Sequence, residues 1–152
     1  RFHTRCPELV PPEGYEFTRA EWRAVMNLRI RLEREGIDAD AVREFVTGEA
    51  SGERLDDEVA AAVRAEFELP ETLSDPSAER VLRDALDDVV SGDDDAARDR
   101  LAEAFPTVCA GDRPALEPTD AGHEAACHLH RGYESAPADG EGTQETAPGA
   151  DE

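Results

Sequence analysis

Residues 75–105 read DPSAERVLRDALDDVVSGDDDAARDRLAEAF, and this stretch decides the fold class. Apolar residues recur in it at the spacing that places them on one face of a helix. Asp75 followed by Pro76 is a typical helix start, and Gly92 is a typical stop. The acidic run after Gly92 favours the N-terminus of a second helix, which Pro106 would end. The stretch therefore predicts two consecutive helices. Their inward-facing residues would be Val81, Leu82, Ala85, Leu86, Val89, Val90, Ala97, Leu101 and Phe105.

A helix is also predicted before this pair, and its first turn carries clear signals. Thr18 and Glu21 have the spacing of a capping box. Phe17 and Trp22 have the spacing of a hydrophobic staple across the same start. Apolar residues then recur at helical spacing as far as Gly36, which we expect to end the helix.

Two shorter helices are predicted between these segments, at residues 40–47 and 55–69. Gly48 and Pro70 follow them as stop signals. The side chains expected to face inward are Val42, Phe45, Val46, Val59, Ala62, Val63, Phe67 and Leu69.

The predicted fold class is mainly α, a small helical bundle inserted between two irregular Cys-bearing loop segments and followed by a disordered acidic tail. The bundle would occupy residues 17–105. Proline and glycine punctuate the flanks, residues 1–16 and 106–133. Residues 134–152 contain almost nothing to bury, which is typical of disorder.

The charge of the chain is extreme. It has 37 acidic residues against 16 basic ones, and every basic residue is Arg. The net charge of −21 is typical of haloarchaeal cytoplasmic proteins, because carboxylates keep a surface hydrated where salt screens their repulsion. It argues against binding to nucleic acid or anionic membranes. Intrinsic disorder and mimicry of a nucleic acid are the alternative interpretations.

Cysteine and histidine avoid the helical region and cluster in the two flanks. If the helical unit brings its ends together, these side chains form one ligand cluster. Thiolates suit zinc or iron–sulfur clusters, and imidazoles suit zinc. Spacing alone leaves unliganded thiols and surface histidines open, because no CxxC or HxxxH pair is present. The candidate ligands are Cys6, Cys109 and Cys127, with His3, His123 and His128 as second-line candidates.

The same residues carry a resemblance to a known family. The string RFHTRCP at residues 1–7 is followed by Cys109, Pro114, Leu116, the Gly122-His123 pair and the run CHL at residues 127–129. This pattern resembles the C-terminal signature of the ATP-binding subunits of oligopeptide and dipeptide ABC transporters, in a haloarchaeal form. Thr4 stands where that family usually has proline. About a hundred residues separate Cys6 from Cys109, where the family has only a few.

The resemblance implies a 4Fe-4S cluster with Cys6, Cys109 and Cys127 as three of its ligands. The fourth cysteine would lie immediately before Arg1, and a chain that begins with Arg1 rather than Met indicates a segment of a longer protein. The implied function is that of a C-terminal accessory segment of a transport ATPase for peptide import. Its partners would be a second ATPase subunit and membrane permease subunits. The alternative is a free-standing helical binding protein with a structural zinc site.

We expect no enzymatic activity from this segment itself. A Walker A phosphate-binding loop requires a lysine, and the sequence contains none. ATP would bind in an upstream domain of the complete subunit. No apolar run approaches the roughly 20 residues of a membrane span, so we expect a cytoplasmic segment that lies peripherally on the inner face of the membrane.

Overall fold

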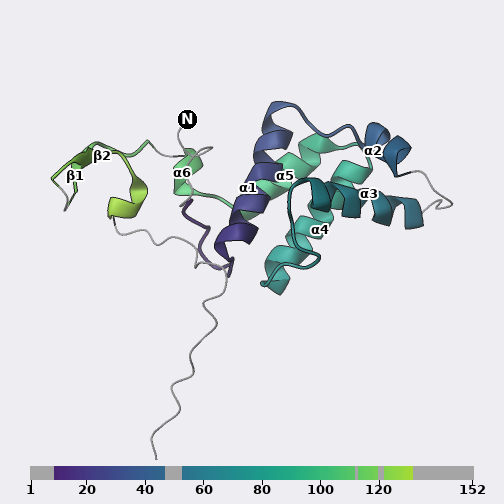
Figure 1. The fold of residues 1–152 in the computed structure, drawn as a ribbon, viewed down its shortest axis with the longest axis horizontal. Helices are drawn as coiled ribbons and strands as arrows, with labels where there is room; N and C mark the ends of the chain where they lie inside the picture. Colours follow the sequence, from purple (N-terminus) through teal and green to yellow (C-terminus); the bar gives the residue numbers. More distant parts are fainter. Residues whose placement is uncertain (1–8, 47–52, 112, 120–121, 132–152) are drawn as a thin grey trace, which may run out of the picture.

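The computed structural model describes residues 9–46, 53–111, 113–119 and 122–131, and the protein is mainly α, as the sequence predicts. Figure 1 shows the helices packed as one body, with a small β-hairpin beyond α6. The elements are α1 (Arg19–Arg34), α2 (Ala39–Phe45), α3 (Glu53–Glu66), α4 (Pro76–Val90), α5 (Asp94–Ala104), α6 (Val108–Gly111), β1 (Glu117–Pro118), β2 (Glu124–Ala125) and the 3-10 helix η1 (His128–Arg131).

The pair α4 and α5 is the centre of the bundle. Asp75 caps α4 by accepting hydrogen bonds from the amides of Ser77 and Ala78, and Asp93 caps α5 through the amide of Ala96. Between them the chain turns at Gly92, whose φ of 82° is readily adopted only by glycine. The two helices predicted from residues 75–105 are thereby confirmed.

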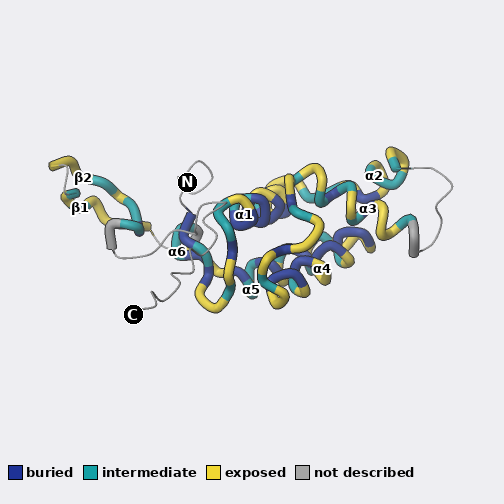
Figure 2. Tube along the Cα trace, turned by 60° about the horizontal axis from the view of Figure 1, so that its bottom comes forward, coloured by how far each residue is buried: buried dark blue, intermediate teal, exposed yellow. Residues whose placement is uncertain are grey.

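The remaining helices of the bundle pack around this pair. α1 lies against α5, α3 against α4, and α2 mainly against α3. Figure 2 shows the buried positions concentrated on the facing sides of α1, α4 and α5. The largest side chains of the core with almost no exposure are Trp22, Phe105, Met26, Leu28, Leu82, Leu86 and Leu101.

The start of α1 has the predicted capping box and staple. The Thr18 hydroxyl accepts from the amide of Glu21, and the Glu21 carboxylate accepts from the amide of Thr18 at 2.8 Å. The Phe17 and Trp22 rings lie 5.3 Å apart between centroids. Phe105, at the C-terminal end of α5, meets Phe17 edge-on at 5.4 Å, so the two ends of the bundle share one aromatic cluster.

Buried carboxylates fix the connections between helices. Glu21 also accepts from the amide and hydroxyl of Ser74, at 2.6 and 2.8 Å, which ties the α3–α4 connection to α1. Glu79 accepts from the amide of Leu73 at 2.9 Å and pairs with Arg64 at 2.5 Å. Glu21 thus holds the amide of Ser74 across 53 positions, and Glu79 holds the amide of Leu73 in the same connection, so both acidic residues have a structural role.

Asp94 makes a comparable bond between α5 and the connection after α1. Its carboxylate accepts from the amide of Ile37 at 2.7 Å. A side chain at Gly36 would approach that carboxylate to 2.4 Å, and Gly36 has a φ of 71°. Glycine is therefore required at position 36 both by the backbone conformation and by the closeness of Asp94.

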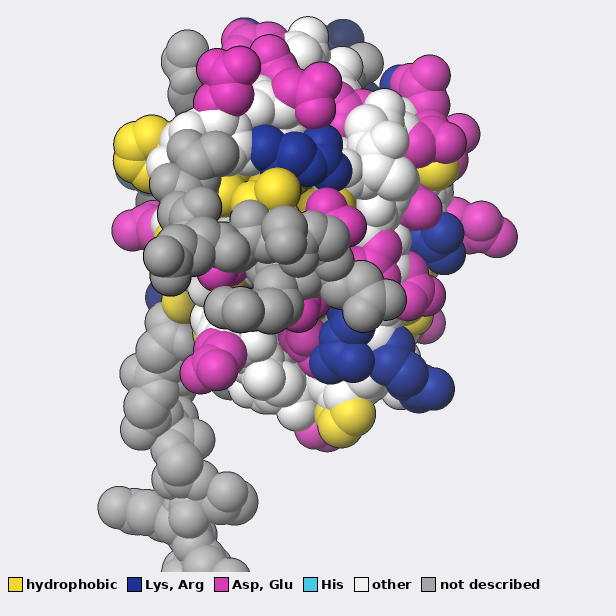
Figure 3. Space-filling model, turned by 90° about the vertical axis from the view of Figure 1, so that its right-hand side faces the viewer, with side chains coloured by type: hydrophobic (Ala, Val, Ile, Leu, Met, Phe, Trp, Pro, Cys, Tyr) yellow, Lys and Arg dark blue, Asp and Glu magenta, His cyan; other side chains and the backbone are white. Residues whose placement is uncertain are grey.

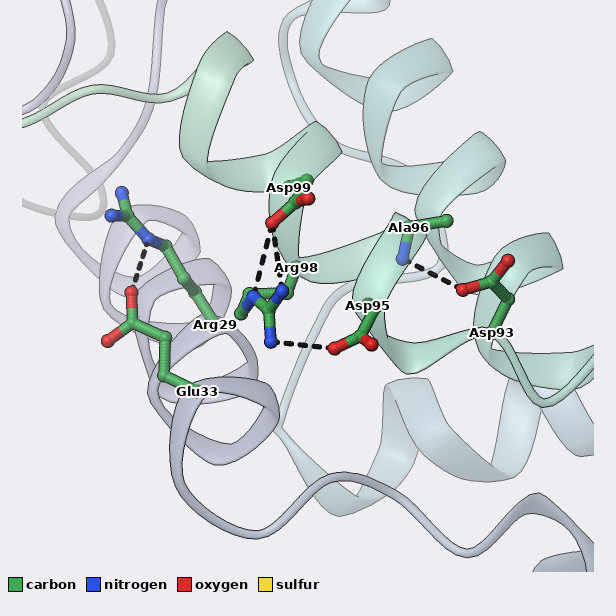
Figure 4. A network of polar contacts seen from close by, with 7 residues as sticks. All are labelled: Arg29, Glu33, Asp93, Asp95, Ala96, Arg98 and Asp99. Atoms are coloured by element: carbon green, nitrogen blue, oxygen red, sulfur yellow. Dashed lines mark hydrogen bonds and ion pairs between the residues drawn. The ribbon is translucent and has the colours of Figure 1, made fainter.

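The surface is dominated by acidic side chains. Figure 3 shows Asp and Glu spread over the end of the molecule near α2 and α3, with a few Arg among them. On α5, Arg98 lies between Asp95 at 2.7 Å and Asp99 at 3.1 Å (Figure 4). The side-chain hydrogen bond to Asp99 raises the pKa of Arg98 above its ordinary value. Such exposed pairs contribute little to stability.

Two details of the predicted helices differ from the structure. The prediction that Phe45 faces inward is wrong, because its side chain is 90% exposed. The seven-residue helix α2 packs mainly against α3. Because a single neighbouring helix covers only one narrow face of α2, Phe45 on another face stays exposed. The third helix ends at Glu66, before the predicted Leu69, because Glu68 takes a left-handed φ of 57°.

The flanks of the bundle are only partly described. Residues 9–16 contain no helix or strand, as predicted. The segment after α5 is largely irregular where it is described, but it includes α6, the β1–β2 hairpin and η1. The predicted disordered tail at residues 134–152 lies outside the described residues. In the part of the chain that the structure describes, no helix has both the length and the apolar character needed to cross a membrane.

We predict that Phe105→Ala lowers the free energy of unfolding by about 3–5 kcal/mol, because it removes a fully buried ring from the aromatic cluster. The matched control is Phe45→Ala, which removes the same atoms from an exposed site and should change stability by less than about 0.5 kcal/mol. Urea unfolding in concentrated salt measures both. Equal effects of the two substitutions would contradict the described core.

We also predict that Asp75 contributes stability that acid removes. Hydrogen bonds from the amide of Glu16 and then that of Ala78 hold the pKa of Asp75 below its ordinary value of 3.8. A lowered folded-state pKa means that the contribution is present above the unfolded-state value and is lost as pH falls through the folded-state value. Unfolding free energies measured from neutral to acid pH should therefore fall less steeply for Asp75→Asn than for the wild type. The exposed Asp57→Asn should follow the wild-type slope, and an unchanged slope in both variants would refute the prediction.

Candidate metal centre

The two flanks of the bundle meet at one end of the molecule. The hydroxyl of Thr107 donates a hydrogen bond of 2.7 Å to the carbonyl oxygen of Val10, 97 positions earlier in the chain. Thr107 is 7% exposed and Val10 is 6% exposed. Figure 1 shows the segment before α1 passing beside the segment that leads into α6. The chain on either side of the five bundle helices is thus held together by a buried contact.

The position of Thr107 is set by the end of α5. Arg29, itself buried, donates from Nη1 to the carbonyl oxygen of Phe105 at 3.0 Å. Its Nε binds Glu33 at 3.1 Å on the next turn of α1 (Figure 4). A carbonyl at the end of a helix lacks an intrahelical donor, and the guanidinium of Arg29 supplies one from α1. The exit of the chain from α5 is therefore fixed two residues before Thr107.

Cys109 lies directly after this contact, in α6. Its amide donates to the Thr107 hydroxyl at 3.3 Å. The side chain is half-buried, packs against the hydrophobic core and forms no disulfide. This candidate ligand is consequently attached to the bundle through both its backbone and its side chain.

Cys127 lies in a separate small lobe, residues 117–131, made of the β1–β2 hairpin and η1. The strands pair antiparallel, with Glu117 opposite Ala125. The turn is closed by Thr119, whose amide and hydroxyl both donate to the carbonyl oxygen of His123, at 2.7 and 2.8 Å. Figures 1 and 2 both show this lobe standing away from the helical body, beyond α6. Cys127 is half-buried between β2 and η1 and has a free thiol.

The histidine candidates differ in burial. His128, the first residue of η1, is only 4% exposed, whereas His123 in the hairpin turn is exposed. Pro114 is half-buried, but Leu116 is 60% exposed, so Leu116 does not pack within the fold. Cys6 and His3, together with Pro7, lie outside the described residues.

The described residues supply part of the predicted ligand set without assembling it. Among residues 9–46, 53–111, 113–119 and 122–131, no group of three or more His, Cys, Asp or Glu side chains is placed to hold a metal ion. Cys109 and Cys127 offer free, half-buried thiols, but Cys109 lies on α6 against the bundle and Cys127 lies in the separate lobe, so the structure does not bring these two candidate ligands together. Thiols of this kind suit zinc or iron–sulfur ligation once deprotonated. A complete site needs four ligands, so it requires Cys6 and one further cysteine or histidine as well.

One residue of this region was not predicted as functional. Thr107 follows Pro106, and nothing in its local sequence distinguishes it from a loop threonine. Its importance comes from Val10, which is remote in sequence.

Comparison with known proteins gives one match. Residues 19–122 match a protein family that is described as a domain of unknown function. The matched segment contains the five bundle helices, α6 and β1, and it includes Cys109 but neither Cys6 nor Cys127. No curated protein and no solved structure matches the chain.

Proposed function

We propose that the chain, which belongs to the family described as a domain of unknown function (DUF8228), is a C-terminal accessory segment of an ABC transporter ATP-binding protein for the import of dipeptides or oligopeptides. The support for this proposal is the resemblance of the cysteine motif in the two flanks, and the family adds nothing to it. In this proposal the segment binds a 4Fe-4S cluster and has no enzymatic activity of its own. ATP would bind in an upstream domain.

The hydrogen bond between Thr107 and Val10 carries this proposal. In the transporter subunits that the sequence resembles, the two halves of the cysteine motif are close in sequence. A helical unit can stand between such halves only if its ends lie close together, because the ligands must still meet. The 2.7 Å contact provides this closure across 97 positions. Cys6 is four positions before Val10, and four residue-to-residue steps span at most about 14 Å.

The proposed ligands are Cys6, Cys109 and Cys127, and the resemblance adds a fourth cysteine before Arg1. Thiolates are the usual protein ligands of a 4Fe-4S cluster, which would serve here as a structural or regulatory centre. Packing of Cys109 against the core would hold one ligand rigidly to the bundle. Hydrogen-bond donors and burial around the thiolates would set the potential of the cluster.

The proposed location is the cytoplasmic face of the membrane, where the segment would lie peripherally. Its partners would be a second ATPase subunit and the membrane permease subunits of the same transporter. The high density of carboxylates, with a net charge of −21, supports the proposal that the protein works in a cytoplasm of high salt concentration.

A free-standing helical binding protein with a structural zinc site is the second candidate. The buried imidazole of His128 adjoins Cys127, and mixed thiolate and imidazole sets are typical of structural zinc. Cys6, Cys109, Cys127 and His128 would then complete a tetrahedral set with no residue from outside this sequence.

Metal analysis of the protein, expressed with its natural upstream residues and purified without oxygen, distinguishes these candidates. We predict a brown protein with about four iron atoms per chain and a broad visible absorbance band. Cys109→Ser and Cys127→Ser should each reduce the iron content and the band severalfold. Ala41→Ser, at an exposed position on α2, is the matched control and should retain both.

The other outcomes are equally informative. A colourless protein with one zinc atom per chain would favour the zinc candidate over the iron–sulfur cluster. A protein that contains neither metal, or a metal content that neither cysteine substitution lowers, would refute both.

A further inference from the structure

We infer that Thr107 is a positioning residue that couples the thiolate site to the helical bundle. This inference rests on the proposed function, because it concerns the same site. Beyond that function, ligand binding at the cysteines and the folding stability of the bundle would affect each other. The residues that carry it are Thr107, Val10, Cys109 and Phe105.

The Thr107 hydroxyl joins both flanks at a single atom. It donates to the carbonyl oxygen of Val10 at 2.7 Å and accepts from the amide of Cys109 at 3.3 Å. Both the donor and the acceptor capacity of the hydroxyl are thus used in a site where water has little access. A side chain of the same shape without the hydroxyl would leave the carbonyl of Val10 and the amide of Cys109 without this partner.

Each side of this contact is held by apolar packing. Leu9 and Val10 are each 6% exposed, and Phe105 is fully buried in the aromatic cluster. Cys109 itself packs against the core. A shift of Cys109 would therefore strain either the Thr107 contact or the packing of the segment before α1.

Coupling follows from this arrangement. A ligand that binds the folded flanks and not the unfolded chain stabilises the folded state by mass action. Because apolar packing and the Thr107 hydroxyl together fix Cys109 and Val10 to the bundle, that stabilisation reaches the bundle helices and is not confined to the flanks. Conversely, loss of the hydroxyl should loosen Cys109 while the helices remain folded.

Two substitutions test this role. Thr107→Val removes the hydroxyl and retains the shape, whereas Thr107→Ser retains the hydroxyl. In reduced, metal-free protein we expect iodoacetamide to modify Cys109 about five- to tenfold faster in Thr107→Val than in the wild type, the factor that corresponds to the loss of one hydrogen bond. In Thr107→Ser the modification rate should stay within about twofold of the wild-type rate, because the hydroxyl and its hydrogen bonds are retained. Cys127, in the separate lobe, is the internal control and should react at an unchanged rate in all three proteins.

The metal-loaded protein provides the second readout. Release of metal to a chelator should be faster in Thr107→Val by a similar factor, with rescue by Thr107→Ser. Circular dichroism monitors whether the helices stay folded. A Thr107→Val protein of lower melting temperature, but with wild-type rates of Cys109 modification and metal release, would show a merely structural role and overturn the inference.

A measurement on the wild type covers the case in which Thr107→Val fails to fold. The amide of Cys109 should be protected from hydrogen exchange, because its acceptor is the buried Thr107 hydroxyl. Rapid exchange of that amide in the folded protein would overturn the inference. A wild type that binds no metal refutes the proposed function instead, while the modification and exchange results still decide the role of Thr107.

Discussion

Burial of the Phe105 ring is the interaction on which the rest of the structure depends. The ring meets Tyr15 at 5.0 Å and Phe17 at 5.4 Å, so it joins the end of α5 to the segment that precedes α1. Burial of such a ring is worth several kcal/mol, whereas a single hydrogen bond contributes about 1 kcal/mol net. Apolar packing therefore closes the bundle, and the Thr107–Val10 hydrogen bond then sets the register of the two flanks.

Acidic residues have two different roles in this molecule. The exposed majority keeps the surface hydrated and contributes little through individual ion pairs. A buried minority, of which Glu21 and Glu79 are the clearest cases, binds backbone amides in the connections between helices. Replacing a buried carboxylate would leave those amides unsatisfied, at a cost greater than that of losing a surface pair. The same residue type thus serves solubility at one position and architecture at another.

The helices could be predicted because their signals are local. Thr18 and Glu21 lie three positions apart, and Asp75 precedes the helix that it caps. The exposure of Phe45 could not be predicted, because it depends on how few helices surround α2. Thr107 could not be recognised either, since its partner Val10 is brought to it only by the fold. For the candidate site, residue type and resemblance identify the cysteines, while Cys6 lies outside the described residues and its meeting with Cys109 stays a prediction.

The proposed function combines these features: a closed helical bundle whose two flanks carry the cysteines of a peptide-transporter ATPase. The most direct test is to determine the natural protein upstream of Arg1, by sequencing its gene and measuring the intact mass of the native chain. The proposal predicts a cysteine immediately before Arg1 and, further upstream, a Walker A loop and an ABC signature. A natural start at or near Arg1, with none of these features, would contradict the transporter function and leave the zinc-binding helical protein as the better account.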